Sequence, residues 1–156
     1  VVQPYHKKTQ HRIQAASHKL LLTNSADPVL PPDPMKQRSA FPPNYVHSLD
    51  STHMMYTANA CGEDDVTFVA VHDSYWTHAS TVDTMNVHCR EQFVRLHSQQ
   101  LLGRLSEYFA LYFQGAELKT GGAKGKEGTH VVDIATPPER GDFDLQEVIK
   151  SPYFFN

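Results

Sequence analysis

The segment "TFVAVHDSYWTH" at residues 67–78 places an ionisable pair, His72 and Asp73, inside an apolar, β-rich run. Phe, Val, Tyr, Trp and Thr favour β-strands, and they fill most of the other positions. The pattern predicts two short strands, at about 67–71 and 74–78, joined by a tight turn at His72 and Asp73. Desolvating a carboxylate without a partner costs roughly several kcal/mol. We therefore expect hydrogen bonds, a cation or a metal ion to compensate the charge of Asp73.

The composition is typical of a globular domain. The chain has 156 residues, of which 40% are hydrophobic and 20% charged, enough for one domain with its own core. The net charge of -3 argues against a protein that coats polyanions over its whole surface, but leaves room for a local basic face. No apolar run approaches the ~20 residues that cross a bilayer, so we expect no membrane partner.

The cysteines and histidines give no metal framework. Cys61 and Cys89 do not form a CxxC pair, which suits a reducing compartment. The ten histidines are more than this length usually carries, but none makes a recognisable zinc spacing. The chain starts at Val1, and neither a signal-peptide pattern nor an Arg- and Ser-rich transit segment follows.

Elsewhere the sequence predicts a mainly helical chain. Helices are expected near residues 5–22, 44–60, 81–97 and 100–114, with a short one at 143–150. A proline-rich connector at 24–43 and a glycine-rich loop at 115–142 should separate them. Apolar residues recur every three or four positions in two of the helices, which predicts that these stripes are core: Val82, Met85, Cys89, Phe93 and Leu96, then Leu102, Leu105, Phe109 and Phe113. The expected fold class is α+β, with a small antiparallel β-hairpin among the helices.

Two polar surfaces leave alternatives open. Lys7, Lys8 and Arg12 lie in a segment without acidic residues, which is either a solvated helix face or a surface that meets phosphates. His47, Asp50 and Ser51 share one face of the expected helix at 44–60. That face either touches a partner or is simply solvated.

The His-Asp turn resembles motif C of the polymerase palm. Four stretches in order are similar to the C-terminal part of single-subunit, phage-type RNA polymerases: "PNYVHSLDSTHM" (43–54), "FVAVHDSYWTHA" (68–79), "REQFVRLHS" (90–98) and "FDLQEVIKSPYFFN" (143–156). Within that family the chain looks most similar to the mitochondrial enzymes of animals. The resemblance runs from about residue 1 to residue 156 and is weakest through 115–142. It implies that residues 1–156 form the C-terminal fragment of a right-hand polymerase catalytic domain.

One position discriminates between polymerases. The related DNA polymerase family usually reads His-Asp-Glu in this turn, whereas Ser74 follows Asp73 here. A longer stretch also follows Asp73 than that family would lead us to expect. RNA synthesis is the better interpretation, and the C-terminal part of a DNA polymerase is an alternative.

The resemblance implies a mechanism and partners. Asp73 would be a catalytic metal ligand for Mg²⁺ in two-metal nucleotidyl transfer, in which the ions activate the primer 3′ oxygen and stabilise the leaving pyrophosphate. A second palm aspartate and a nucleotide-gripping helix are expected upstream of residue 1. The implied partners are a DNA template, an RNA product, ribonucleoside triphosphates and mitochondrial transcription factors, in the mitochondrial matrix.

The resemblance also assigns further residues. His47 and His72 would contact the RNA–DNA hybrid or the RNA 3′ end. The C-terminal foot (143–156), which ends in Phe154, Phe155 and Asn156, would fold back towards the active site. A different class stays open: a non-catalytic, histidine-rich binding or structural module, which would need no second carboxylate.

The purified 156-residue chain should not make RNA. A single carboxylate cannot position two metal ions, and the nucleotide-binding helix is missing, so several sources of transition-state stabilisation are lost together. Template-dependent incorporation of labelled ribonucleotides measures this, with a full-length polymerase as the positive control. Incorporation by the chain alone, free of other polymerases, would refute the fragment interpretation.

Overall fold

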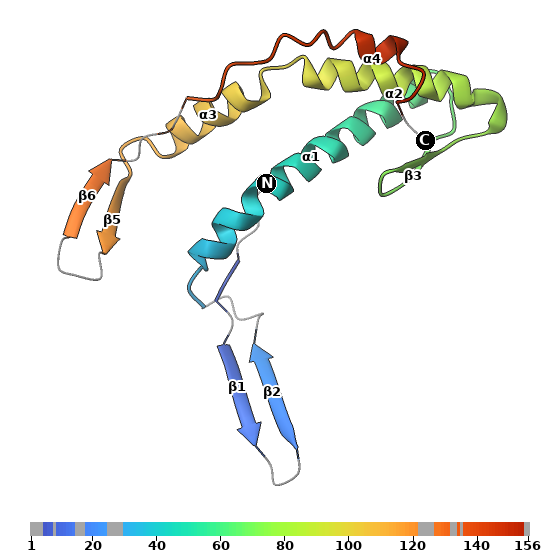
Figure 1. Cartoon of the computed structure of the whole chain (residues 1–156). Helices are drawn as coiled ribbons and strands as arrows, with labels where there is room; N and C mark the ends of the chain where they lie inside the picture. The colour runs from blue at the N-terminus through green and yellow to red at the C-terminus, as the bar shows by residue number, and fades with distance from the viewer. Residues whose placement is uncertain are drawn as a thin grey trace. The chain divides into compact units, whose positions relative to one another are not determined.

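The computed structural model describes residues 5–7, 9–14, 18–24, 30–121, 127–131, 134 and 136–154. The chain divides into two compact units, residues 1–55 and 56–156, and each is described by itself. Helix α1 (Pro34–Glu63) begins in the first unit and ends in the second (Figure 1). Helices occur together with three two-stranded antiparallel sheets, so the predicted mixed, mainly helical class is confirmed.

The first unit opens with a β-hairpin. Strand β1 (Thr9–Gln14) pairs antiparallel with β2 (Lys19–Asn24), and the register sets Ile13 opposite Leu20. Before it, the Lys7 amide donates to the Pro31 carbonyl at 2.9 Å. The Asp33 amide donates to the Tyr5 carbonyl at 2.7 Å, so residues 5–7 lie along residues 31–33.

The expected helix at 5–22 was wrong, because residues 9–14 and 19–24 are strands. That prediction rested on Ile13, Ala16 and Leu20, and three apolar residues in about twenty positions are too few to fix a helical period. Pairing between the two strands satisfies the backbone donors and acceptors and overrides a weak local preference.

Helix α1 starts ten residues before the predicted position, so the expected connector at 24–43 was wrong from Pro34 onward. The Asp33 carboxylate Oδ1 accepts hydrogen bonds from the Met35 and Lys36 amides, at 3.1 and 3.2 Å. Asp33 is therefore the N-cap, and Pro34 occupies the first helical position, where its missing N–H does no harm. Two further prolines inside the helix, Pro42 and Pro43, lack an N–H as well.

The second unit carries the predicted hairpin and most of the helices. Strands β3 (Val69–Val71) and β4 (Ser74–Trp76) pair antiparallel, and a 3₁₀ turn η1 (Ala79–Thr81) leads into α2 (Val82–His97). Helix α3 (Leu101–Tyr112), strands β5 (Glu117–Gly121) and β6 (Glu127–Val131), and α4 (Glu147–Lys150) follow. The hairpin at 67–78 and the helices near 81–97 and 100–114 agree with the sequence analysis.

A small core joins the hairpin to the helices of the second unit. Cys61 at the end of α1, Val66 and Met85 of α2 are buried together, and Phe68 and Tyr75 of the hairpin pack against them. The Phe68 and Tyr75 rings meet edge to face with centroids 5.2 Å apart. Strands of three residues are too short to be stable alone, so this core determines where the hairpin lies.

The buried thiols extend this core along α2. Cys89 is 2% exposed and hydrogen-bonds to Thr57, and burial raises the pKa of its thiol to about 11. Burial also raises the pKa of Cys61. Both groups therefore stay protonated at neutral pH and behave as small apolar side chains rather than as nucleophiles or metal ligands.

Two further expectations were wrong. No residue of α3 is buried, and Leu102 and Phe113 of the predicted core stripe are exposed. The glycine-rich segment is not a structureless loop throughout, because β5 and β6 pair from Glu117↔Val131 to Gly121↔Glu127. Among the described residues, no helix combines the length and apolar character of a membrane span.

Replacing Asp33 with Ala should destabilise the start of α1 by about 1 kcal/mol, because two helix amides lose their acceptor. Hydrogen exchange at the Met35 and Lys36 amides should speed up correspondingly. Asp33→Asn, which retains an acceptor oxygen, is the matched control and should exchange at nearly the original rate. Equal exchange in the Ala and Asn variants would contradict the N-cap assignment.

Candidate functional site

The β3–β4 hairpin has one packed and one open face. Ala70 and Tyr75 are half-buried on the packed face, whereas Val69, Val71 and Trp76 are exposed on the other. At the base of the hairpin, the Thr77 hydroxyl Oγ1 donates to the Thr67 carbonyl at 2.6 Å. The hairpin is therefore held along one face and at its base, and its turn projects into solvent.

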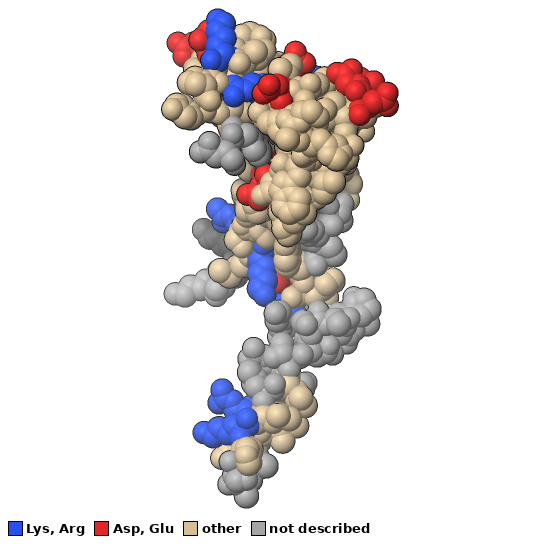
Figure 2. Space-filling view, turned by 90° about the vertical axis from the view of Figure 1, so that its right-hand side faces the viewer, with Lys and Arg blue, Asp and Glu red and all other residues tan. Residues whose placement is uncertain are grey.

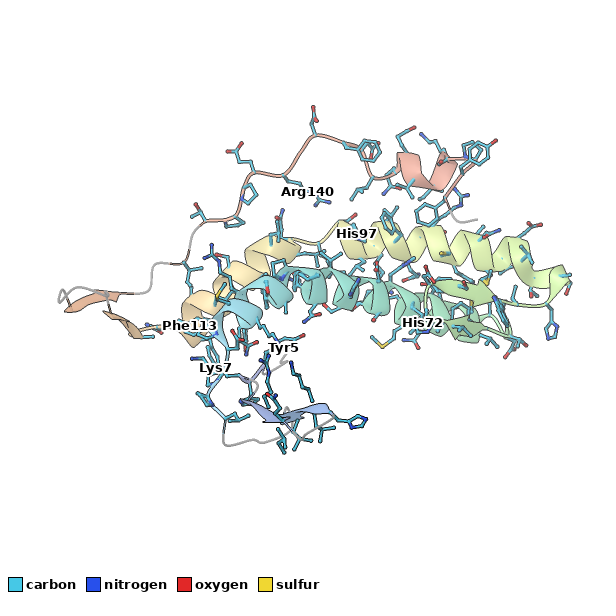
Figure 3. All side chains as sticks on the ribbon, turned by 60° about the horizontal axis from the view of Figure 1, so that its bottom comes forward. Tyr5, Lys7, His72, His97, Phe113 and Arg140 are labelled. Carbon is cyan, nitrogen blue, oxygen red and sulfur yellow. The ribbon has the colours of Figure 1, made fainter. Side chains whose placement is uncertain are left out.

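His72 occupies the turn with a strained backbone. Its φ is 56°, in the left-handed region that most residues avoid, whereas Asp73 has no positive φ. Positive φ at only the first central residue is the sign pattern of a type II′ turn, where glycine is usual. A non-glycine residue held in this region costs of order 1–3 kcal/mol, and such strain tends to cluster at functional sites. Figure 3 labels His72 at this turn.

Asp73 is exposed beside His72, and its side chain makes no hydrogen bond or ion pair with the described residues. The apolar neighbours of Asp73 in the sequence predicted a partner for its carboxylate. At an exposed turn, however, water solvates the carboxylate. The group is thus accessible, and an exposed carboxylate oxygen is the donor that Mg²⁺ prefers. Asp73 therefore suits a hard cation as one ligand of a larger set.

The chain does not complete such a ligand set in its described part. Over those residues, no group of three or more His, Cys, Asp or Glu side chains could hold a metal ion. His72 is the titratable neighbour of Asp73 in the turn, and its side chain is also exposed. The turn can therefore contribute one carboxylate and one imidazole to a site whose other ligands come from elsewhere.

His47 lies on α1 in the first unit, whereas the turn belongs to the second. Its side chain is exposed, and its backbone carbonyl accepts a hydrogen bond from the Ser51 hydroxyl at 3.1 Å. That bond turns Ser51 back onto its own helix, which fits a helix-orienting role rather than a contact with a partner. Asp50 is exposed next to it.

The β1–β2 hairpin has a basic face. Because directly paired residues share a face and faces alternate, Arg12 and Lys19 lie on one face while Ile13, Leu20 and Leu22 lie on the other. All five side chains are exposed. Figure 2 shows Lys and Arg side chains gathered on this hairpin.

The other expected phosphate contacts are placed only in part. Lys7 is exposed just before the hairpin, and Figure 3 labels it next to Tyr5. The Tyr5 hydroxyl accepts a hydrogen bond from the Asn44 side chain at 3.1 Å, which ties this segment to α1. Lys8 lies outside the described residues.

Phe154, the first of the three final residues of the expected foot, docks on α2. Its ring meets Phe93 edge to face with centroids 5.1 Å apart, and the Arg90 guanidinium carbon lies 5.4 Å from its centroid. Phe155 and Asn156 lie outside the described residues. The resemblance implied that the aromatic tail folds back towards the active site, but sequence reasoning missed Arg90. The sequence signal for Arg90 was its position one turn before Phe93, which belongs to the apolar stripe.

Comparison with known proteins gives consistent matches. A family model described as DNA-dependent RNA polymerase matches residues 1–127. DNA-directed RNA polymerase 1A of Nicotiana tabacum is 48% identical over the whole chain, which covers 88% of that relative. Mitochondrial DNA-directed RNA polymerase 1 of Nicotiana sylvestris is 48% identical, and the mitochondrial enzyme of Mus musculus is 42% identical. The chain covers only 14% and 13% of these two longer relatives.

Replacing His72 tests the backbone strain at the turn. His72→Val should lower the free energy of unfolding by about 1–2 kcal/mol, because a β-branched residue tolerates a left-handed φ poorly. His72→Gly should be at least as stable as the original chain. Urea denaturation followed by circular dichroism measures both. A Val variant as stable as the Gly variant would show that the turn does not impose this φ in solution.

Proposed function

Because the chain belongs to the DNA-dependent RNA polymerase family, we propose that it is the part of a template-directed RNA polymerase that supplies the metal-binding aspartate Asp73. The observation that carries this proposal is the accessible carboxylate of Asp73. It lies at the tip of a hairpin that packs one of its faces on a core. Family membership favours RNA synthesis over the DNA polymerase alternative. It also leaves the histidine-rich binding module without an observation in its favour.

Asp73 would hold a divalent ion at the reacting phosphate. When bound, a pair of Mg²⁺ ions would activate the RNA 3′ oxygen and neutralise charge on the leaving pyrophosphate. Mg²⁺ is commonly held by one or two protein carboxylates together with substrate phosphates. The second carboxylate would come from an earlier palm motif, as the resemblance implies.

The two histidines would contact the nucleic acid near that site. His72 is placed by the turn immediately before Asp73, so its imidazole can hydrogen-bond the RNA 3′ end or orient the carboxylate. His47 would reach the minor-groove side of the hybrid from α1. Minor-groove acceptors are similar for all base pairs, so such a contact would sense duplex geometry rather than sequence.

The basic face of the β1–β2 hairpin would contact phosphates. Arg12 and Lys19 lie on the same face without an acidic residue in either strand, and Lys7 is exposed nearby in sequence. Lys8, which belongs to the same segment without acidic residues, would add a further charge. Each cation that meets a phosphate releases a counterion, so binding through this face would weaken as salt rises.

The C-terminal foot would position the site rather than supply a ligand. Phe154 is fixed on α2, and Phe155 and Asn156 would continue from it towards the active site.

The relatives include enzymes named mitochondrial and others named chloroplastic. We infer the mitochondrial matrix as the location and mitochondrial transcription factors as partners of the complete enzyme.

In a full-length polymerase that contains this segment, Asp73→Asn should lower the rate at saturating nucleotide by several orders of magnitude. The substitution keeps size and hydrogen-bonding capacity but removes the charge that holds the metal ion, which is worth roughly several kcal/mol. Template binding should remain almost unchanged, because the loss falls on the chemical step. Single-nucleotide addition on a preformed RNA–DNA scaffold separates the two quantities.

Asp65→Asn is the matched control. Asp65 is exposed, lies before β3, and has a φ of 54°, which Asn tolerates. It should elongate at nearly the original rate, and His72→Ala should fall between the two aspartate variants. Near-normal elongation by Asp73→Asn, with unchanged dependence on magnesium, would mean that Asp73 is not a metal ligand.

A further inference from the structure

Two arginines fix the C-terminal segment to α2. One belongs to α2 and the other to the C-terminal segment. Arg90 of α2 donates through Nη1 to the Val148 carbonyl at 3.0 Å and to the Ser151 carbonyl. Arg140 of the C-terminal segment donates to the Ser98 carbonyl at 3.1 Å and to the His97 carbonyl. Figure 3 shows Arg140 and His97 facing each other. Each guanidinium therefore lies at the C-terminal end of a helix that belongs to the other segment.

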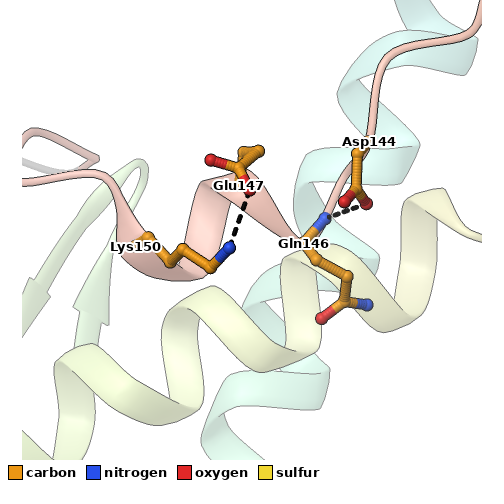
Figure 4. A network of polar contacts seen from close by, with 4 residues as sticks. All are labelled: Asp144, Gln146, Glu147 and Lys150. Atoms are coloured by element: carbon orange, nitrogen blue, oxygen red, sulfur yellow. Dashed lines mark hydrogen bonds and ion pairs between the residues drawn. The ribbon is translucent and has the colours of Figure 1, made fainter.

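These positions are chemically favourable for a guanidinium. The last carbonyls of a helix have no partner within it and carry partial negative charge. Arginine has several N–H donors in a fixed plane, so one side chain can reach two carbonyls at once. Helix α4 has only four residues, and the side-chain bonds at its start and within it are local. The Asp144 carboxylate accepts a hydrogen bond from the Gln146 backbone amide, and Lys150 pairs with Glu147 (Figure 4). The hydrogen bonds of Arg90 to Val148 and Ser151 therefore tie α4 to α2.

Arg90 also contacts Phe154, near the end of the foot. Its guanidinium lies over the Phe154 ring, which packs edge to face on Phe93. Phe93 in turn stacks on His97 with centroids 4.1 Å apart and an interplanar angle of 29°. One arginine thus combines two carbonyl contacts and one ring contact, and lysine could not reproduce that combination.

Helix α2 carries the hairpin and the foot on one rigid element. Met85 is part of the buried core under the hairpin, and Arg90 follows five residues later. At 1.5 Å per residue, the two positions are only about 7.5 Å apart along the helix axis. Any shift of the C-terminal segment on α2 is consequently a shift relative to the turn that bears Asp73.

We propose that Arg90 is the positioning residue that sets the C-terminal foot relative to the Asp73 turn. It acts through the Val148 and Ser151 carbonyls and the Phe154 ring. This inference rests on the proposed function, because it takes the foot to contribute to nucleotide addition. Arg90 itself touches neither substrate nor metal in this account.

The test compares four variants of a full-length polymerase containing this segment: Arg90→Ala, Arg90→Lys, deletion of residues 154–156, and the deletion combined with Arg90→Ala. Single-nucleotide addition on a preformed scaffold gives kcat and KM. Small misplacements of a site can cost up to about 100-fold, so Arg90→Ala should lower kcat by roughly 10- to 100-fold with little change in scaffold affinity. Arg90→Lys should not restore the rate. Arg104→Ala, which removes an exposed guanidinium bonded to the Gln99 side chain, should change little.

The combined variant decides whether Arg90 acts through the foot. Once residues 154–156 are deleted, Arg90→Ala should have no further effect on kcat. Hydrogen exchange at residues 147–150 should also speed up in Arg90→Ala, which shows that the contact itself was lost. Faster exchange with an unchanged rate would overturn the proposal, and so would an equal loss of rate with and without residues 154–156.

The outcome separates this inference from the proposed function. If deletion of 154–156 leaves kcat unchanged while Asp73→Asn abolishes it, the positioning role of Arg90 is refuted and the metal-ligand role of Asp73 stands. If Asp73→Asn elongates normally, the proposed function fails whatever Arg90 does.

Discussion

The packing of the β3–β4 hairpin on its small core is the constraint on which the candidate site depends. Two strands of three residues cannot hold a turn in place by their own hydrogen bonds. Phe68 and Tyr75 supply the missing stability by packing against Cys61, Val66 and Met85. This arrangement leaves the opposite face and the turn in solvent, so Asp73 combines a fixed backbone with an accessible carboxylate. A metal ligand needs both properties.

The hairpin and α2 could be predicted because their signals are local and strong. Strand-forming residues on both sides of His72 and Asp73 permit few other structures. In α2 the apolar stripe repeats over four turns, and Met85 and Cys89 are buried as expected. The site assignment needed more than pattern. Alternation places Asp73 in a turn, but only the ordered resemblance over the whole chain indicates a role for it.

The remaining elements could not be predicted because long-range contacts or missing partners decide them. The β1–β2 hairpin depends on pairing between strands, which a single weak apolar period does not reveal. The start of α1 follows the Asp33 cap, a signal that the surrounding prolines concealed. Helix α3 has the pattern of a core helix, yet Leu102 of its apolar stripe is 50% exposed. Periodicity indicates which face is apolar but not whether anything in the chain covers it.

Chemical location of the metal ion tests most directly whether Asp73 binds it. In a full-length polymerase containing this segment, Fe²⁺ can replace Mg²⁺, and ascorbate with peroxide then generates radicals that cleave the backbone beside the bound ion. We expect cleavage within a few residues of Asp73, suppressed by excess Mg²⁺ and lost in Asp73→Asn. Absence of cleavage at the β3–β4 turn, or undiminished cleavage in Asp73→Asn, would contradict it.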